Sequence, residues 1–204
     1  MKLYYAPGAC SLSPHISLRE AGVSFDLERV DLASRKTASG EDFSKINPKG
    51  YVPALRLDDG EVLTEGAVMV QFIADKYPAA GLAPVNGTLE RVRLQEHLNF
   101  IASELHKAFS PLFNPSTSGE AKQAAVASIA RRLDHFERVL GDGRLYLLGE
   151  RFSVADAYLF TVASWAGPTG IGLDRWPKVA AFVARVAARP SAQAAMRAEG
   201  LMAA

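Results

Sequence analysis

Hydrophobic and polar positions follow two different periods along this chain. Up to Pro78, short apolar runs alternate with turn-forming residues, which is typical of strands and short helices in a mixed domain. Further along, apolar residues recur at every third or fourth position, which is typical of amphipathic helices. Three glycine and proline residues interrupt the stretch between these parts. The sequence therefore predicts an α/β domain over residues 1–78, a linker over 79–87 and an all-helical domain over 88–204.

The α/β domain is predicted to begin with a strand, a helix and a second strand. Leu3–Tyr5 ends the first strand, and Ser13 is the expected cap of a helix that has Pro14 at its first position and ends at Gly22. Residues 25–30 form the second strand. A strand–helix–strand unit implies a parallel pair of strands joined by a right-handed crossover.

The rest of this domain reads as a hairpin followed by a helix. Strands are predicted at 52–57 and 61–63, separated by an Asp-Asp-Gly turn. Helical spacing follows from Gly66 to Tyr77, while 33–41 is polar and is expected to be an exposed loop. Together these elements predict a four-stranded mixed sheet with helices packed against it.

In the helical domain, the apolar pattern predicts five helices and one polar loop. The loop covers 110–119 and contains two prolines. The helix from Val154 is apolar on nearly all sides, so it is expected to be buried. Ser153 and Asp156 can cap its first turn reciprocally, a structural role. The helices are expected at 88–109, 120–140, 154–166, 179–188 and 191–199.

Composition excludes several classes of function. The 204 residues carry a net charge of +1, so nothing favours binding to nucleic acid or to an anionic membrane. No apolar run approaches the ~20 residues that span a bilayer, and Pro7 interrupts the beginning of the chain where a signal peptide would be apolar. A single cysteine, with no partner for a disulfide, fits a reducing cytoplasm. The four histidines lack zinc-ligand spacing, so no metal is expected.

The cysteine, Cys10, has two readings. It lies in the predicted turn between the first strand and the first helix, close to the positive end of the helix dipole. That position favours a thiolate and accepts anionic ligands. The alternative is a small buried apolar residue, because free cysteine is among the most buried residue types.

Five segments in a fixed order carry a resemblance to a known family. With the predicted fold, they resemble a cytosolic glutathione S-transferase, and are most similar to the bacterial beta class. The resemblance covers essentially the whole chain and implies a thioredoxin-like N-terminal domain. The segments are YAPGACSLSPH at 5–15, NPKGYVPAL at 47–55, LTEG at 63–66, NFIASELHK at 99–107 and FSVADAYLF at 152–160.

The resemblance implies that the chain binds glutathione as a co-substrate, with no tightly bound cofactor. Cys10 and His106 are the expected catalytic pair: Cys10 forms a mixed disulfide, and His106 hydrogen-bonds near the sulfur. The Val52–Pro53 bond is expected to be cis, so that Val52 pairs with the ligand backbone. The expected glutathione-binding residues are Cys10, Ser11, Arg35, Lys36, Val52, Pro53, Glu65, Gly66, Asn99, Ser103, Glu104, Leu105, His106 and Lys107.

Each of these roles has a plainer structural alternative. Pro53 could be a trans proline on an edge strand. Glu65 could simply complement the dipole of the following helix. Asn99, Ser103 and His106, at i, i+4 and i+7, share one face of a regular helix, and such polar residues are often only solvated.

The resemblance also implies a partner subunit and a second substrate. In the beta class the segment 99–107 reaches the glutathione of the neighbouring subunit, so a homodimer is expected. The second substrate is an apolar electrophile held in a cleft between the domains. The residues expected around it are Tyr5, Ala6, Phe109, Phe113 and Trp165.

Three functions remain open at this point. The leading hypothesis is a glutathione transferase that activates the thiol for attack on apolar electrophiles, with detoxification as one role. The second is a glutathione-dependent thiol-disulfide oxidoreductase with Cys10 as nucleophile. The third is a non-catalytic ligand-binding member of the fold.

Overall fold

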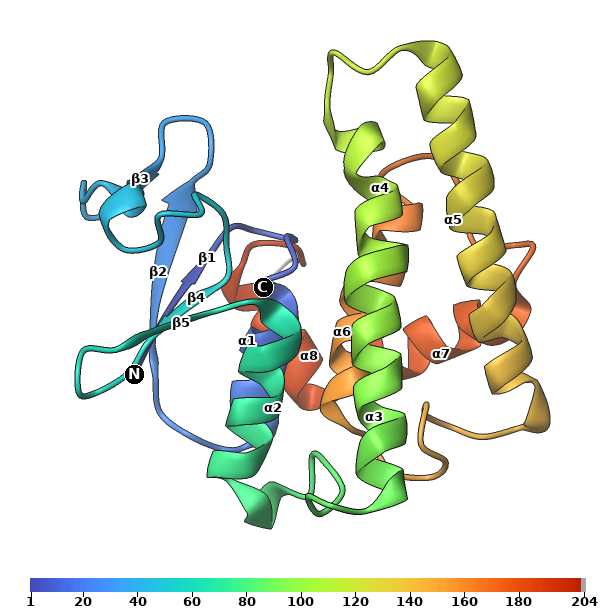
Figure 1. The fold of residues 1–204 in the computed structure, drawn as a ribbon, viewed down its shortest axis with the longest axis horizontal. Helices are drawn as coiled ribbons and strands as arrows, with labels where there is room; N and C mark the ends of the chain where they lie inside the picture. Colours follow the sequence, from blue (N-terminus) through green and yellow to red (C-terminus); the bar gives the residue numbers. More distant parts are fainter. Residues whose placement is uncertain (203–204) are drawn as a thin grey trace. The chain divides into compact units, whose positions relative to one another are not determined.

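The computed structural model describes residues 1–202, and its chain divides into two compact units (Figure 1). The N-terminal unit contains residues 1–83 together with residues 188–202. The helical unit contains residues 84–187. The C-terminal helix thus belongs to the first unit, although the sequence pattern grouped it with the helices. An amphipathic pattern shows which face of a helix is apolar, but not which partner covers that face.

A mixed sheet forms the centre of the N-terminal unit, with strand order β3-β2-β1-β4-β5. β1 and β2 are parallel, as the strand–helix–strand pattern predicts, and the other neighbouring pairs are antiparallel. Its strands are β1 (Lys2–Tyr5), β2 (Asp26–Asp31), β3 (Lys36–Thr37), β4 (Ala54–Arg56) and β5 (Val62–Thr64).

The described sheet has five strands, whereas the sequence predicted four. The extra strand is β3, which pairs with β2 through Thr37 opposite Val30 and Lys36 opposite Asp31. It lies in the segment predicted to be a loop. Two residues are too few to show alternation, so the pattern of apolar positions could not reveal this strand.

The helices of the N-terminal unit are α1 (Leu12–Glu20), α2 (Gly66–Lys76), α8 (Pro190–Ala198) and the short 3-10 helices η1 (Phe43–Lys45) and η2 (Pro78–Ala80). The predicted cap of α1 is wrong. Ser11, not Ser13, precedes the helix, and the Ser13 hydroxyl donates to the carbonyl of Cys10 at 3.0 Å. The strand-to-helix turn is therefore two residues shorter than expected.

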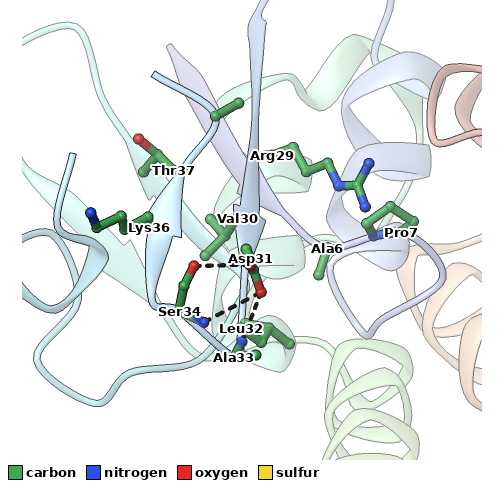
Figure 2. A pocket seen from close by; sticks show the side chains of 11 residues that line it. Ala6, Pro7, Arg29, Val30, Asp31, Leu32, Ala33, Ser34, Lys36 and Thr37 are labelled. Atoms are coloured by element: carbon green, nitrogen blue, oxygen red, sulfur yellow. Dashed lines mark hydrogen bonds between the residues drawn. The ribbon is translucent and has the colours of Figure 1, made fainter. Parts of the chain in front are cut away.

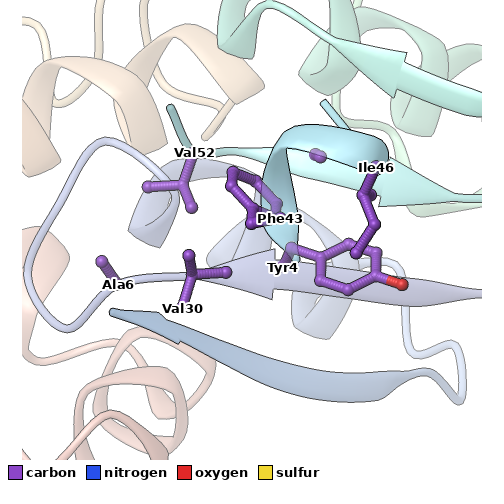
Figure 3. Packing of buried hydrophobic residues seen from close by; sticks show 7 residues of the cluster. Tyr4, Ala6, Val30, Phe43, Ile46 and Val52 are labelled. Atoms are coloured by element: carbon purple, nitrogen blue, oxygen red, sulfur yellow. The ribbon is translucent and has the colours of Figure 1, made fainter. Parts of the chain in front are cut away.

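Two apolar clusters cover the two faces of the sheet because successive side chains of a strand point to opposite sides. Leu3 packs with residues of α1 and α2 on one face. Tyr4 packs with Val30, Phe43 and Val52 on the other (Figure 3). The two clusters hold β1 in the middle of the unit, and β1 leads directly into the turn that carries Cys10.

The helical unit contains α3 (Leu89–Phe100), a π-helix η3 (Ile101–Leu105), α4 (His106–Phe113), α5 (Gly119–Val139), η4 (Leu140–Asp142), α6 (Val154–Ala163), η5 (Ser164–Ala166) and α7 (Pro177–Ala187). None of the helices within residues 1–202 is both long and apolar enough to cross a membrane.

Two features of α3 and α4 differ from the sequence prediction. The predicted regular helix is interrupted by the π-helix η3. After it, α4 continues to Phe113 and contains Pro111. The loop predicted from residue 110 therefore starts later. Phe109 is buried and stacks on Phe113 four residues on, at 6.4 Å between ring centroids, and this pair supports the last turn.

All residues of α6 are buried, as its apolar sequence predicts. The Asp156 carboxylate accepts hydrogen bonds from the amide of Ser153 at 2.7 Å, the hydroxyl of Ser153 at 2.7 Å and the amide of Leu147 at 2.8 Å. The expected capping by Asp156 is confirmed. Burial raises the pKa of Asp156 to about 6, so the carboxylate is ionised at neutral pH despite its enclosure.

Candidate active site

The turn between β1 and α1 holds Cys10 in a partly exposed position. Its backbone is closed by hydrogen bonds from Leu12 N to Ala9 O at 3.0 Å and from Ala9 N to Ala6 O at 3.1 Å. The Ser11 hydroxyl is fully buried, where it donates to Ala6 O and accepts from Ala6 N, both at 3.2 Å. Ser11 therefore stabilises this turn by two hydrogen bonds to the backbone of Ala6, five residues earlier.

The structure brings Cys10 beside Val52, 42 positions away in sequence. The Cys10 thiol donates to the carbonyl oxygen of Val52 at 3.2 Å. The Val52–Pro53 peptide bond is cis, as the resemblance implies. Cys10 and the backbone expected to pair with glutathione thus lie within hydrogen-bond distance of each other.

Glu65 lies immediately before α2 and has a positive φ of 68°. Its carboxylate accepts from the Lys49 ammonium at 2.6 Å and from the Tyr51 hydroxyl at 3.2 Å. The hydrogen bond from Lys49 raises the pKa of that ammonium. The helix begins at Gly66, so its first amides point toward the same end as Glu65. A carboxylate and free helix amides at one place can bind an α-amino acid group, which carries one charge of each sign.

Arg35 and Lys36 are adjacent in sequence, but their side chains lie in different places. The Arg35 guanidinium carbon lies against Gly50, 3.9 Å from where a Cβ on that residue would be. Lys36 instead lines a groove of about 600 Å³ with Arg29 and the Ala6–Pro7 segment (Figure 2). Gly50 is in the turn leading to Val52, so Arg35 lies beside the start of the cis-proline segment.

A buried carboxylate accepts a hydrogen bond from the backbone of the Cys10 turn. Glu199, just after α8, accepts from the amide of Gly8 at 2.9 Å and bonds to Nδ1 of His15 at 2.8 Å. The side chains of Glu199 and His15 are fully buried. Arg19 completes the chain of contacts through a hydrogen bond to Nε2 of His15 at 3.0 Å.

The π-helix rearranges the polar face predicted for residues 99–107. Asn99, Ser103 and Lys107 are exposed, whereas His106 is partly buried and Leu105 is fully buried. The wider turn of a π-helix breaks the i, i+4, i+7 alignment that a regular α-helix would give. Glu104, also in the predicted set, forms an ion pair with Arg132 at 2.6 Å.

His106 stands in an aromatic cluster of the helical unit. Its Nδ1 lies 2.9 Å from the hydroxyl of Tyr158, and its ring meets the Trp165 ring edge-on at 4.9 Å. Trp165 also contacts Phe109 at 5.6 Å and Phe113 at 5.3 Å. Burial, with a smaller contribution from the Lys107 charge, lowers the pKa of His106 to about 4. The imidazole is therefore neutral at pH 7, with one donor and one acceptor nitrogen.

Three of the residues predicted for the second-substrate pocket, Phe109, Phe113 and Trp165, thus come together in this cluster. Tyr5 and Ala6, the other two, belong to the N-terminal unit. Burial is the main cause that raises the pKa of Tyr5, so its phenol is protonated at neutral pH. Among residues 1–202, no three His, Cys, Asp or Glu side chains form a group that could hold a metal ion.

Comparisons with known proteins bear on this arrangement. Residues 8–76 match the family model "Glutathione S-transferase, N-terminal domain", and residues 100–190 match "Glutathione S-transferase, C-terminal domain". The chain belongs to the glutathione S-transferase family. The thioredoxin-like domain with a mixed sheet and the all-helical domain are the fold expected of a glutathione S-transferase, and the expectation of an enzyme of this type agrees with the membership.

Individual glutathione S-transferases are similar over the whole chain. The glutathione S-transferase GstA of Escherichia coli O157:H7 is 48% identical, over 98% of this chain and 100% of that protein. A sphingomonad glutathione S-transferase solved in complex with glutathione is 50% identical, with a TM-score of 0.95 over 99% of this chain and 100% of the other. The beta-class glutathione S-transferase of Sphingomonas chungbukensis is also 50% identical, with a TM-score of 0.96 over the same shares. The resemblance to the bacterial beta class is confirmed.

Several residues that contact the expected site were not found from the sequence. They are Lys49 and Tyr51 on Glu65, Glu199 below the Cys10 turn and Tyr158 on His106. Lys49 and Tyr51 lie inside the segment at 47–55, so a search for cations near Glu65 would have noticed them. Tyr158 lies inside the segment at 152–160, but that segment was assigned only a structural role. Glu199 gave no signal, because the predicted helix around it was only amphipathic.

Proposed function

We propose that this protein is a glutathione transferase that joins the thiolate of glutathione to apolar, aromatic electrophiles. The observation that carries the proposal is the arrangement in the N-terminal unit. The Cys10 thiol lies 3.2 Å from the Val52 carbonyl at a cis proline, and a carboxylate, Glu65, precedes the helix start at Gly66. Backbone, acid and helix amides match the peptide backbone, ammonium and carboxylate of glutathione.

Each end of glutathione has a proposed partner. Glu65 takes the γ-glutamyl ammonium, and the amides at the start of α2 take the carboxylate beside it. Of the two cations at the other end, Arg35 is proposed to bind the glycyl carboxylate because it lies against Gly50, near the cis-proline segment. Lys36 instead lines the groove that contains Arg29 and Ala6–Pro7. Arg35→Ala is expected to weaken glutathione binding about tenfold and Lys36→Ala less than twofold, as measured by calorimetry.

The chemistry follows from the thiol. Helix amides and a hydrogen bond from His106 stabilise the thiolate of bound glutathione, which lowers the pKa of the glutathione thiol. The thiolate attacks an electrophilic carbon; a carbon–sulfur bond forms, and the leaving group departs with the electron pair of its bond. Phe109, Phe113 and Trp165 supply an apolar surface for an aromatic substrate.

A second activity uses Cys10 directly. Its thiolate attacks a sulfur of glutathione disulfide, a mixed disulfide forms, and one glutathione leaves as thiolate. The partial exposure of Cys10 supports this, since a fully enclosed thiol would be inert. We also propose that the protein acts in the cytoplasm as a homodimer in which residues 99–107 serve the partner's site.

The experiment is a binding and turnover assay on the purified protein. Calorimetry with glutathione should show one site per chain, and conjugation of a model aryl halide should release halide in proportion to product. Absence of any heat of binding would refute the proposal. Binding without turnover on a panel of electrophiles would favour a ligand-binding member of the family, and a sedimentation experiment that shows a monomer would contradict the dimer.

A further inference from the structure

The environment of His106 distinguishes its two ring nitrogens. Among the described residues, the only hydrogen-bond partner of the imidazole is the Tyr158 hydroxyl, 2.9 Å from Nδ1. Nε2 has no protein partner there. The ring is held from the side by Trp165, at 4.9 Å and 72°, and by the edge-on ring of Tyr158, at 6.1 Å and 88°. The imidazole therefore has a fixed orientation, with Nδ1 bonded to Tyr158 and Nε2 without a partner among the described residues.

The direction of the Tyr158–His106 hydrogen bond decides what that nitrogen can do. A phenol O–H is a better donor than a neutral imidazole N–H, and an unprotonated imidazole nitrogen is a better acceptor than a phenol oxygen. The favoured arrangement has Tyr158 donating to Nδ1. The proton of the neutral ring then resides on Nε2, because the bond made by one nitrogen sets the tautomer of the other.

We propose that Tyr158 is a positioning residue that holds His106 in the Nε2–H tautomer, so that His106 acts as a hydrogen-bond donor and not as a base. The consequence for glutathione rests on the proposed function: an Nε2–H group stabilises a thiolate, whereas a bare Nε2 would have to take the thiol proton first. Tyr158 is well placed for this role because it comes from α6, whose residues are all buried.

The first test does not need glutathione. With the whole protein labelled with 15N-histidine, the ring nitrogens of His106 are assigned by comparison with His106→Gln and read at pH 7. The expected spectrum has a protonated Nε2 and an unprotonated Nδ1. The opposite tautomer overturns the proposal, whether or not the protein binds glutathione.

The second test measures the consequence. Tyr158→Phe removes the donor and keeps the ring. Thr161→Val is the matched control, because Thr161 is also buried in α6 and, among the residues described, its hydroxyl bonds only its own helix, to Ala157 O at 2.8 Å. The thiolate absorbance of bound glutathione is titrated against pH in both variants. Tyr158→Phe should reduce the thiolate fraction about 3- to 10-fold below the thiol pKa, the effect of one ordinary hydrogen bond, while binding changes by less than about twofold.

The control separates a positioning role from a structural one. Thr161→Val should leave the thiol titration unchanged even if it lowers the melting temperature. Equal shifts of the titration in both variants would overturn the proposal, as would an unchanged titration in Tyr158→Phe. If the wild-type protein shows no thiolate absorbance with glutathione, the proposed function fails, and the NMR tautomer still decides the role of Tyr158.

Discussion

Replacing Glu199 by alanine should destabilise the protein strongly, although only five residues follow it in the sequence. The variant removes the acceptor of the Gly8 amide and leaves His15 without its carboxylate partner, in a place where both side chains have no exposed surface. Each buried donor that loses its acceptor costs about 1–3 kcal/mol, so the loss of both should cost about 3–5 kcal/mol. Glu199→Gln keeps an oxygen acceptor and should lose about 1–2 kcal/mol.

Urea unfolding at a fixed protein concentration measures this difference. With a slope of about 2 kcal/mol/M, Glu199→Ala should move the midpoint down by about 1.5–2.5 M. Glutathione binding, measured below the unfolding transition, should weaken as well because Gly8 lies in the turn that carries Cys10. The reasoning is refuted if Glu199→Ala unfolds within about 1 kcal/mol of the wild type, or if it is no less stable than Glu199→Gln.

Three further substitutions test the site. Cys10→Ala should abolish the mixed disulfide with glutathione seen by mass spectrometry and retain conjugation of an aryl halide. His106→Asn should remove a pH dependence of the protein's stability. The pKa of His106 is about 4 in the folded protein against an ordinary 6.5, so the unfolded chain takes up the proton first as the pH falls. The stability of the wild type relative to the variant should therefore fall by about 2–3 kcal/mol between pH 7 and pH 4. Lys49→Met should tighten glutathione binding about two- to fivefold at low salt, because Lys49 occupies the Glu65 carboxylate in the free protein.

Each of these has its own contrary result. Loss of conjugation in Cys10→Ala would make the cysteine part of the transfer reaction. A constant stability difference between wild type and His106→Asn across this pH range would mean that the ring is not protected from protonation. Lys45→Met is the control for Lys49, since Lys45 is exposed and has no ion pair among the residues described. Equal effects of the two lysine variants would point to net charge alone.

The periodicity of apolar residues was sufficient for most of the fold. It predicted the parallel pair β1–β2 from the order strand–helix–strand, the hairpin β4–β5 with the help of its Asp-Asp-Gly turn, and the buried helix α6 from apolar residues on nearly all sides. It could not predict β3, which is only two residues long, or the π-helix η3, which has no distinct apolar pattern. Both are local departures stabilised by their tertiary surroundings.

The candidate site was predictable in its types of residue and less so in its contacts. The resemblance named Cys10, Glu65 and His106, and the structure supplied what sequence spacing does not contain. Lys49, which lies in a different turn, donates a hydrogen bond to the Glu65 carboxylate, and Tyr158 bonds to His106 from 52 positions away. Contacts of this kind depend on how elements pack, so no local pattern encodes them.

The return of the chain's last helix to the first one has a consequence for biosynthesis. α8 packs on α1, and Arg189 and Ser191 both bond to Glu20. The N-terminal unit is therefore built from two stretches of the sequence that the whole helical unit separates. The part that is synthesised first cannot complete its packing, nor can the cysteine turn acquire its support from Glu199, until residues 84–187 have been made.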